Sequence, residues 1–175
     1  MKSNLRLRDS INRANELIDY AISLGQSVIA ITEHETVANA IKIQEYYEKI
    51  KVNNPNFKVI LGNEIYLCRD GLTAENFMRG KDKYYHFILL AKDIIGHQQI
   101  REISTRAWKR SWMTGKMRRV PTYYQDLIDI IGANPGHIIG STACLGSFID
   151  IKLLEYSSTQ DAELYKKIIN WCISM

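Results

Sequence analysis

Six side chains of this sequence could bind a metal ion or transfer a proton, and each stands in or beside a short apolar segment or loop. They are carboxylates, imidazoles and one thiol: Asp9, Glu33, His34, Glu64, His86 and Cys144. A mixture of oxygen, nitrogen and sulfur ligands is typical of zinc and manganese sites. Because these residues are far apart in the sequence, only a fold that brings their segments together would make them one site.

Each of these residues also has a structural interpretation. Asp9 is among the best helix N-cap residue types, and that role alone would explain it. Glu33 and His34 are also what an ordinary solvated loop contains, while Cys144 could be a small buried side chain. A carboxylate at Glu64, inside a predicted strand, would be costly without a cation, so a functional role is favoured there.

The elements that must position these residues alternate between strand and helix. Residues 28–31 are consecutive apolar residues, which predicts a strand covered on both faces. Glu33, His34 and Glu35 would lie at its carboxyl end, where loops of α/β folds gather ligands. Further strands are predicted at 58–68, 84–91 and 137–140, and helices at 11–24, 37–51, 94–111, 123–131, 148–156 and 161–173.

This alternation predicts the α/β class, built from right-handed βαβ units with a largely parallel sheet. Four strands are few for a closed barrel, which needs about eight. His86 lies at the start of its predicted strand, so its position alone favours a structural histidine. Gly62, within the 58–68 strand, predicts either a bulge or a close approach of another part of the protein.

Composition narrows the class of protein. The chain has 175 residues, is 46% hydrophobic and carries a net charge of +4, which suits one globular domain and permits nucleic-acid binding without requiring it. No apolar run reaches the roughly 18 residues of a membrane span. The three cysteines are far apart, which favours a reducing compartment. We therefore expect a soluble, cytoplasmic protein with no membrane partner.

A basic segment at 106–119 could contact nucleic acid. It has no acidic residue and includes Trp108 and Trp112 among six basic residues: Arg106, Lys109, Arg110, Lys116, Arg118 and Arg119. Cations interleaved with aromatic rings can follow a phosphate backbone and stack on bases. The alternatives are a solvated helix end with inward tryptophans, or a surface for domain docking. We expect a mobile loop, exposed apart from Trp108.

Five segments of the chain resemble successive motifs of a known family. In order they are Asn4–Ser10, Ala30–His34, Leu61–Tyr66, His86–Asp93 and Ser141–Gly146. They are similar to motifs of the polymerase-and-histidinol-phosphatase (PHP) domain, in the version found at the front of the bacterial replicative DNA polymerase III alpha subunit. The resemblance covers nearly the whole chain.

The resemblance implies a distorted (β/α)7, TIM-like barrel with zinc or manganese ions at its carboxyl face. Asp9, His34, Glu64, His86 and Cys144 fall on ligand positions of the family, and Glu33 stands where the family usually has Asp, as a residue supporting the ligands. The family's opening strand with a His-x-His pair and its closing Asp-x-His segment have no counterpart within residues 1–175. The chain is therefore expected to be a single incomplete PHP domain.

The resemblance also implies function and partners. DNA and the remaining polymerase domains or replisome subunits are the expected partners. A completed site would hydrolyse phosphoesters in the manner of a metal-dependent 3′–5′ exonuclease. The alternative is a non-catalytic scaffold or truncated remnant, and a histidinol-phosphatase-like phosphoesterase is the least favoured. We expect His34, Glu64 and Cys144 to point into one cleft, and this chain alone to be inactive.

Overall fold

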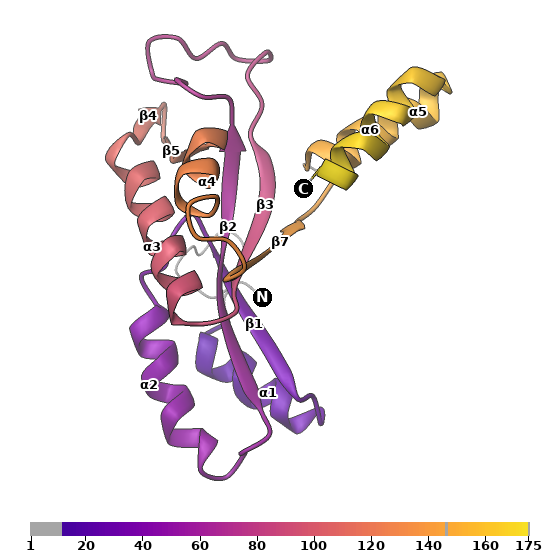
Figure 1. Ribbon diagram of the computed structural model, residues 1–175. Coiled ribbons are helices and arrows are strands. Elements are labelled where there is room, and N and C mark those ends of the chain that lie inside the picture. Colours follow the sequence, from indigo (N-terminus) through magenta and orange to yellow (C-terminus); the bar gives the residue numbers. More distant parts are fainter. Residues whose placement is uncertain (1–11, 146, 175) are drawn as a thin grey trace.

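The computed structural model describes residues 12–145 and 147–174, so Asp9 lies outside the described residues. Most of the described chain forms one sheet with helices beside it (Figure 1). The strands lie in the order β1, β2, β3, β7, and β6 pairs with the end of β2. Their bounds are Val28–His34 for β1, Lys58–Cys68 for β2, Tyr85–Ala91 for β3, Pro121–Tyr123 for β6 and Ile138–Thr142 for β7.

The helices pack their apolar side chains on this sheet. Figure 1 shows α2 and α3 following one another along one side of it. The bounds are Ala14–Ser23 for α1, Ala40–Lys51 for α2, Ile94–Lys109 for α3 and Tyr124–Ile130 for α4. Ile18 of α1 packs with Ile29 and Ile31 of β1, while Ile100 and Ile103 of α3 pack with residues of β2 and β3. Burial of these aliphatic side chains holds the strand ends in place.

The sheet is mixed, which corrects the expectation of a largely parallel sheet of βαβ units. β1 and β2 are parallel, as are β2 and β6, but β3 runs antiparallel to both β2 and β7. Parallel neighbours need a crossover connection, usually a helix. Residues 69–84 contain no helix and return the chain directly, so β3 reverses direction.

The described residues form an open sheet with β1 and β7 at its edges. The class is thus mixed α/β, as expected, and the TIM-like barrel stays a prediction. Beyond β7, α5 (Phe148–Thr159) and α6 (Ala162–Ser174) form a helical pair that projects away from the sheet (Figure 1). No helix in the described ranges is long and apolar enough to cross a membrane.

The basic segment is more ordered than a loop. It contains the end of α3 and a small hairpin made of β4 (Trp112–Thr114) and β5 (Met117–Arg119). The burial of its tryptophans is also the reverse of the expectation, because Trp108 is 41% exposed whereas Trp112 is half-buried. The turn at Gly115 has a positive φ of 59°, which suits glycine and closes the hairpin.

Candidate metal centre

Three strands and one loop bring four of the predicted ligands together. His34 ends β1 and lies opposite Glu64 in the parallel register of β1 and β2. His86 lies opposite Tyr66, two residues beyond Glu64, in the antiparallel register of β2 and β3. Because β3 is reversed, its first residues lie at the carboxyl ends of β1 and β2. The position of His86 at the start of its strand therefore places it in the site.

Glu64 is the centre of this cluster. Its Oε1 lies 3.0 Å from Nδ1 of His86 and 3.6 Å from Nδ1 of His34. The same His86 nitrogen is 3.2 Å from Sγ of Cys144. Glu64 and His34 are buried, His86 is half-buried and Cys144 is exposed, so the cluster extends from the interior to the surface. His34, Glu64 and Cys144 therefore belong to one cluster, and the expectation that they point into one cleft stays a prediction.

Tyr66 completes the cluster, although it was not among the residues predicted to form the site. Its ring stacks on His86 with centroids 4.6 Å apart and planes inclined by 27°. It also meets His34 edge-on at 5.5 Å. Tyr66 lies two residues after Glu64 in a strand, so both side chains point to the same face. That spacing was the available signal.

Gly62 allows the strands around Glu64 to approach closely. A Cβ atom at this position would lie 2.6 Å from the carbonyl oxygen of Leu89 and 2.9 Å from side-chain atoms of Thr32 and Leu90. Such distances are shorter than van der Waals contact, so any larger residue would push β2 away from β3. The predicted close approach at Gly62 is confirmed.

The end of β1 is fixed by backbone contacts at Glu35. Its φ of 55° is in the left-handed region, which is uncommon for glutamate and is often found at functional sites. The Glu35 amide donates to the carbonyl of Glu64 at 2.7 Å, and the Trp108 indole donates to the carbonyl of Glu35 at 2.5 Å. The chain leaving His34 is thereby tied to both β2 and α3.

The Glu33 side chain lies on the face of β1 opposite to that of His34, since the side chains of adjacent strand residues point to alternate faces. It is buried, and its backbone carbonyl accepts a hydrogen bond from the Asn63 side chain at 2.8 Å. Asn63 also donates to the carbonyl of Thr36 at 3.0 Å. These bonds brace the turn that follows His34. A direct role of the Glu33 carboxylate beside the metal ligands stays a prediction.

Two of the six basic residues of the 106–119 segment form ion pairs. Arg110 binds Asp126 through two nitrogens, at 2.6 and 2.9 Å, and Arg106 binds Glu102 at 2.8 Å and Asp129 at 3.2 Å. Lys109, Lys116 and Arg118 are exposed, and Arg119 is half-buried over aromatic rings. Nucleic-acid contact by this segment stays a prediction, and Arg106 and Arg110 have a structural role in addition.

The side chains of the cluster are of the types that bind a divalent metal, although in this structure they contact one another. Glu64, His34, His86 and Cys144 offer oxygen, nitrogen and sulfur, the set that zinc accepts. Among the described residues, no group of three or more histidine, cysteine, aspartate or glutamate residues has the spacing of a ready-made metal site. One His86 nitrogen serves both Glu64 and Cys144, so ligation would require these side chains to separate.

Comparisons with known proteins agree with the resemblance. The sequence model of the PHP domain matches residues 1–175. A Bacillus subtilis (strain 168) protein named Probable DNA polymerase YorL is 39% identical over 189 residues, covering 99% of this chain and 14% of its own length. The DNA polymerase III subunit alpha of Treponema pallidum (strain Nichols) is 24% identical over 167 residues, covering 94% and 13%.

Solved structures give a weaker likeness. A candidate metal-dependent phosphoesterase from Bifidobacterium adolescentis aligns with a TM-score of 0.34 and 19% identity, over 58% of this chain and 31% of its own. This alignment is too limited to support an argument about function. The sequence relatives are more informative, and this chain spans only 13–14% of the length of the two polymerases.

Proposed function

The chain belongs to the PHP domain family and resembles the PHP regions of DNA polymerase III alpha subunits, and from this premise we propose that its Glu64 cluster is part of a metal-dependent phosphoesterase site. The observation that supports the proposal most is that Glu64 lies beside two imidazoles, one of which contacts the Cys144 thiol. His34, Glu64, His86 and Cys144 would hold the metal, with Asp9 as a further ligand. The proposed whole fold is the distorted (β/α)7 barrel.

The metal, zinc or manganese, would act as a Lewis acid on a phosphoryl oxygen and lower the pKa of a bound water. Glu64 supplies the central negative charge from a buried position, which makes its attraction for a cation stronger than on the surface. Tyr66 holds the His86 ring by stacking, and the bond from Trp108 to Glu35 holds the chain after His34. These contacts fix the directions of the donor atoms.

The substrate we propose is the 3′ end of a DNA strand, hydrolysed as in a 3′–5′ exonuclease. The partners are then DNA and the other domains of a polymerase, since the relatives are much longer polymerases. A second candidate is a non-catalytic brace within such a polymerase. The observation favouring it is that, within the described residues, the donors contact each other and form no ready-made site.

A nuclease assay separates these candidates. The substrate is a 3′-labelled single strand with manganese, offered to the 175-residue chain and to a longer protein that adds the flanking segments of the relatives. We expect little turnover by the chain alone, because the remaining ligand positions of the family pattern would come from those segments. The longer protein should degrade the strand, and Glu64→Gln should reduce its rate about a hundredfold or more.

The matched control is Glu45→Gln, which changes an exposed glutamate of α2 outside the cluster and should keep the full rate. If the longer protein is inactive with either metal while it binds DNA and folds normally, the brace is correct and the phosphoesterase proposal is wrong. Activity that survives Glu64→Gln would also contradict the proposal, because it would place the chemistry elsewhere.

A further inference from the structure

Arg119 differs from Arg69, Arg106 and Arg110 because no carboxylate of the described residues neutralises it. Arg69, Arg106 and Arg110 each bind an aspartate or glutamate. Among the described residues, Arg119 forms no ion pair. Its Nε is buried without a hydrogen-bond partner, while the residue as a whole is half-buried. Leaving guanidinium nitrogens without acceptors costs free energy. An external anion can neutralise the charge at the part of this half-buried side chain that faces solvent.

Aromatic rings hold this guanidinium. Its Cζ lies 5.1 Å from the centre of the Tyr84 ring and 5.8 Å from that of Phe77. Phe77 lies 6.4 Å from Trp112, the residue opposite Arg119 in the β4–β5 hairpin. A guanidinium over an aromatic face keeps its in-plane N–H groups available, in a fork that fits phosphate. Phe77, Tyr84 and Trp112 are only half-buried, so parts of their rings face solvent.

The rings continue from Arg119 to the Glu64 cluster. Tyr84 lies 6.4 Å from Tyr66, and Tyr66 stacks on His86 at 4.6 Å. His86 in turn contacts Glu64 at 3.0 Å. Two aromatic rings therefore separate the unpaired cation from the proposed hydrolytic centre. A single ligand with several phosphates and several flat groups could contact both.

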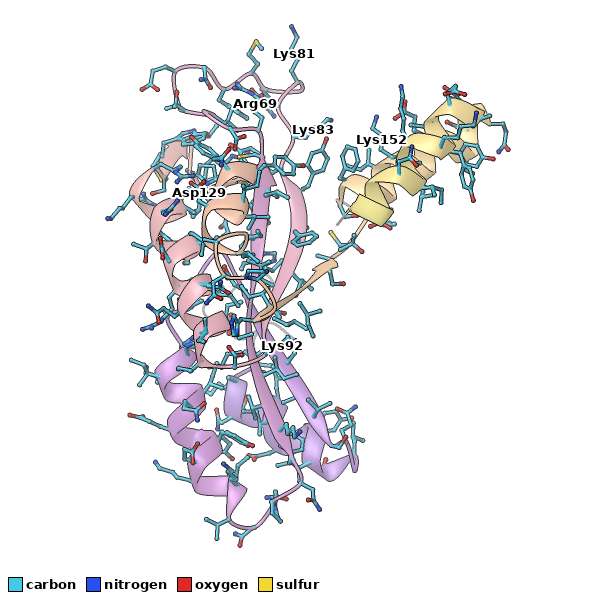
Figure 2. The ribbon with its side chains drawn as sticks, in the orientation of Figure 1. Arg69, Lys81, Lys83, Lys92, Asp129 and Lys152 are labelled. Carbon is cyan, nitrogen blue, oxygen red and sulfur yellow. The ribbon has the colours of Figure 1, made fainter. Side chains whose placement is uncertain are left out.

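The surroundings of this track are basic. Lys83, two residues before β3, is exposed, and so are Lys116 and Arg118 of the hairpin. Figure 2 shows Lys81 and Lys83 at the end of the sheet where the β2–β3 loop lies, and Lys92 near the opposite end of β3. Asp82 is also nearby, but it is occupied by Arg69 at 2.6 Å. The positive charge around Arg119 is therefore only partly compensated.

We propose that Arg119, with Phe77, Tyr84 and Trp112, is an anchoring site for a phosphate of single-stranded nucleic acid whose adjacent bases stack on the half-exposed rings. The strand then follows Tyr84 and Tyr66 towards Glu64. This inference rests on the proposed phosphoesterase function for the direction of the strand, but binding at Arg119 needs no metal. Single strands fit better than duplex because only their unpaired bases offer faces for stacking.

The test is binding in metal-free buffer, so that it is independent of hydrolysis. A short fluorescent oligothymidylate is titrated with the 175-residue chain, and its anisotropy is followed at several salt concentrations. Arg119→Gln should weaken binding about tenfold and reduce the salt slope by roughly 0.7, the value for one phosphate contact on a single strand. Arg119→Lys should retain the salt slope and lose part of the affinity, because it keeps the charge without the planar fork.

Lys92→Gln removes one exposed charge near the other end of β3 and is the matched control. It should change the affinity much less than Arg119→Gln. Tryptophan fluorescence gives a second reading that needs no variant at Arg119: the oligonucleotide should quench the unmodified chain, and Trp112→Leu should remove part of that quenching. The proposal is overturned if Arg119→Gln and Lys92→Gln behave alike in folded proteins, if quenching is unaffected by Trp112→Leu, or if duplex binds as tightly as single strand.

Discussion

Glu64 and Asp126 are two carboxylates with the same burial and opposite surroundings. Each residue is 4% exposed. Asp126 receives two bonds from Arg110 and a third from the Tyr123 amide at 2.9 Å. Glu64 instead meets the imidazoles of His86 and His34. A guanidinium keeps its charge at any ordinary pH, whereas an imidazole can lose its proton near neutrality and then bind a metal.

The difference shows that burial of a carboxylate does not by itself identify a site. The Asp126 charge is permanently compensated, so a cation would gain little there, and the pair holds α4 against the end of α3. Around Glu64 the partners are imidazoles, a side-chain type that also serves as a metal ligand. The chemistry of the partner therefore distinguishes a structural carboxylate from one that can serve a ligand.

The largest expected effect is on stability, at Asp126. Asp126→Ala leaves Arg110 without its acceptors in a half-buried position, and it should reduce the free energy of unfolding by about 3 kcal/mol. Denaturant unfolding of the 175-residue chain measures this. Asp129→Ala, which removes an exposed partner of Arg106, should cost less than about 1 kcal/mol. Equal losses in the two variants would show that the Asp126 pair has no special structural weight.

Gly62→Ala tests the close packing of β2 against β3, which positions Glu64 beside His86. The added methyl group meets a backbone oxygen that cannot rotate away, so we expect a loss of about 2 kcal/mol. Gly25→Ala provides the control. A Cβ atom at Gly25 would meet open space, so the only cost there comes from the positive φ of 70°. It should lose about 1 kcal/mol. A Gly62→Ala protein as stable as the unmodified chain would contradict the close packing described above.

Glu64→Gln should have a smaller effect on stability than either change. The amide keeps the shape and an acceptor for His86, so the free energy of unfolding without metal should change by less than about 1 kcal/mol. Any rise in melting temperature that manganese or zinc gives the unmodified chain should be lost. A large loss of stability without metal would show that Glu64 is a structural carboxylate like Asp126. The contrast drawn between the two residues would then be wrong.

The smallest effect concerns pH and a histidine outside the cluster. Burial, and then the charge of Arg101, lowers the pKa of His97 below its ordinary value. The unfolded chain therefore binds this proton first, so stability should fall as pH decreases below about 6.5 and continue to fall until the folded pKa is reached. His97→Gln should flatten this part of the stability curve. An unchanged pH dependence in that variant would show that His97 does not contribute.

Local signals in the sequence predicted the elements well. The strand predicted at 58–68 is β2. The helix predicted from residue 94 is α3, and Asp93 caps it by accepting a hydrogen bond from the Gly96 amide at 2.9 Å. Apolar runs and caps can be predicted from the sequence because they depend on neighbouring residues. The helix predicted at 123–131 is α4 (Tyr124–Ile130), whose N-cap is Tyr123 with its amide held by Asp126. Such errors of one residue do not affect the site.

The direction of β3 is the feature that local signals could not supply. A strand has the same alternation whichever way it runs, so the sequence did not show that His86 would lie beside Glu64. The resemblance to a family identified His86, while its physical reason came from the antiparallel pairing. Tyr66 was also missed as part of the site, and the left-handed conformation of Glu35 was not predicted, since each depends on contacts with distant residues.

The reversed β2–β3 connection also has a consequence for how this chain can vary. Residues 69–83 leave and re-enter the sheet at the edge that carries Glu64 and His86, while the ladder between the strands sets the register of these two residues. Insertions or deletions within that connection would change the reach of the loop without altering the pairing. The length of this segment and the placement of Glu64 and His86 are therefore separable, so natural variation or protein engineering can change the loop without moving these two side chains.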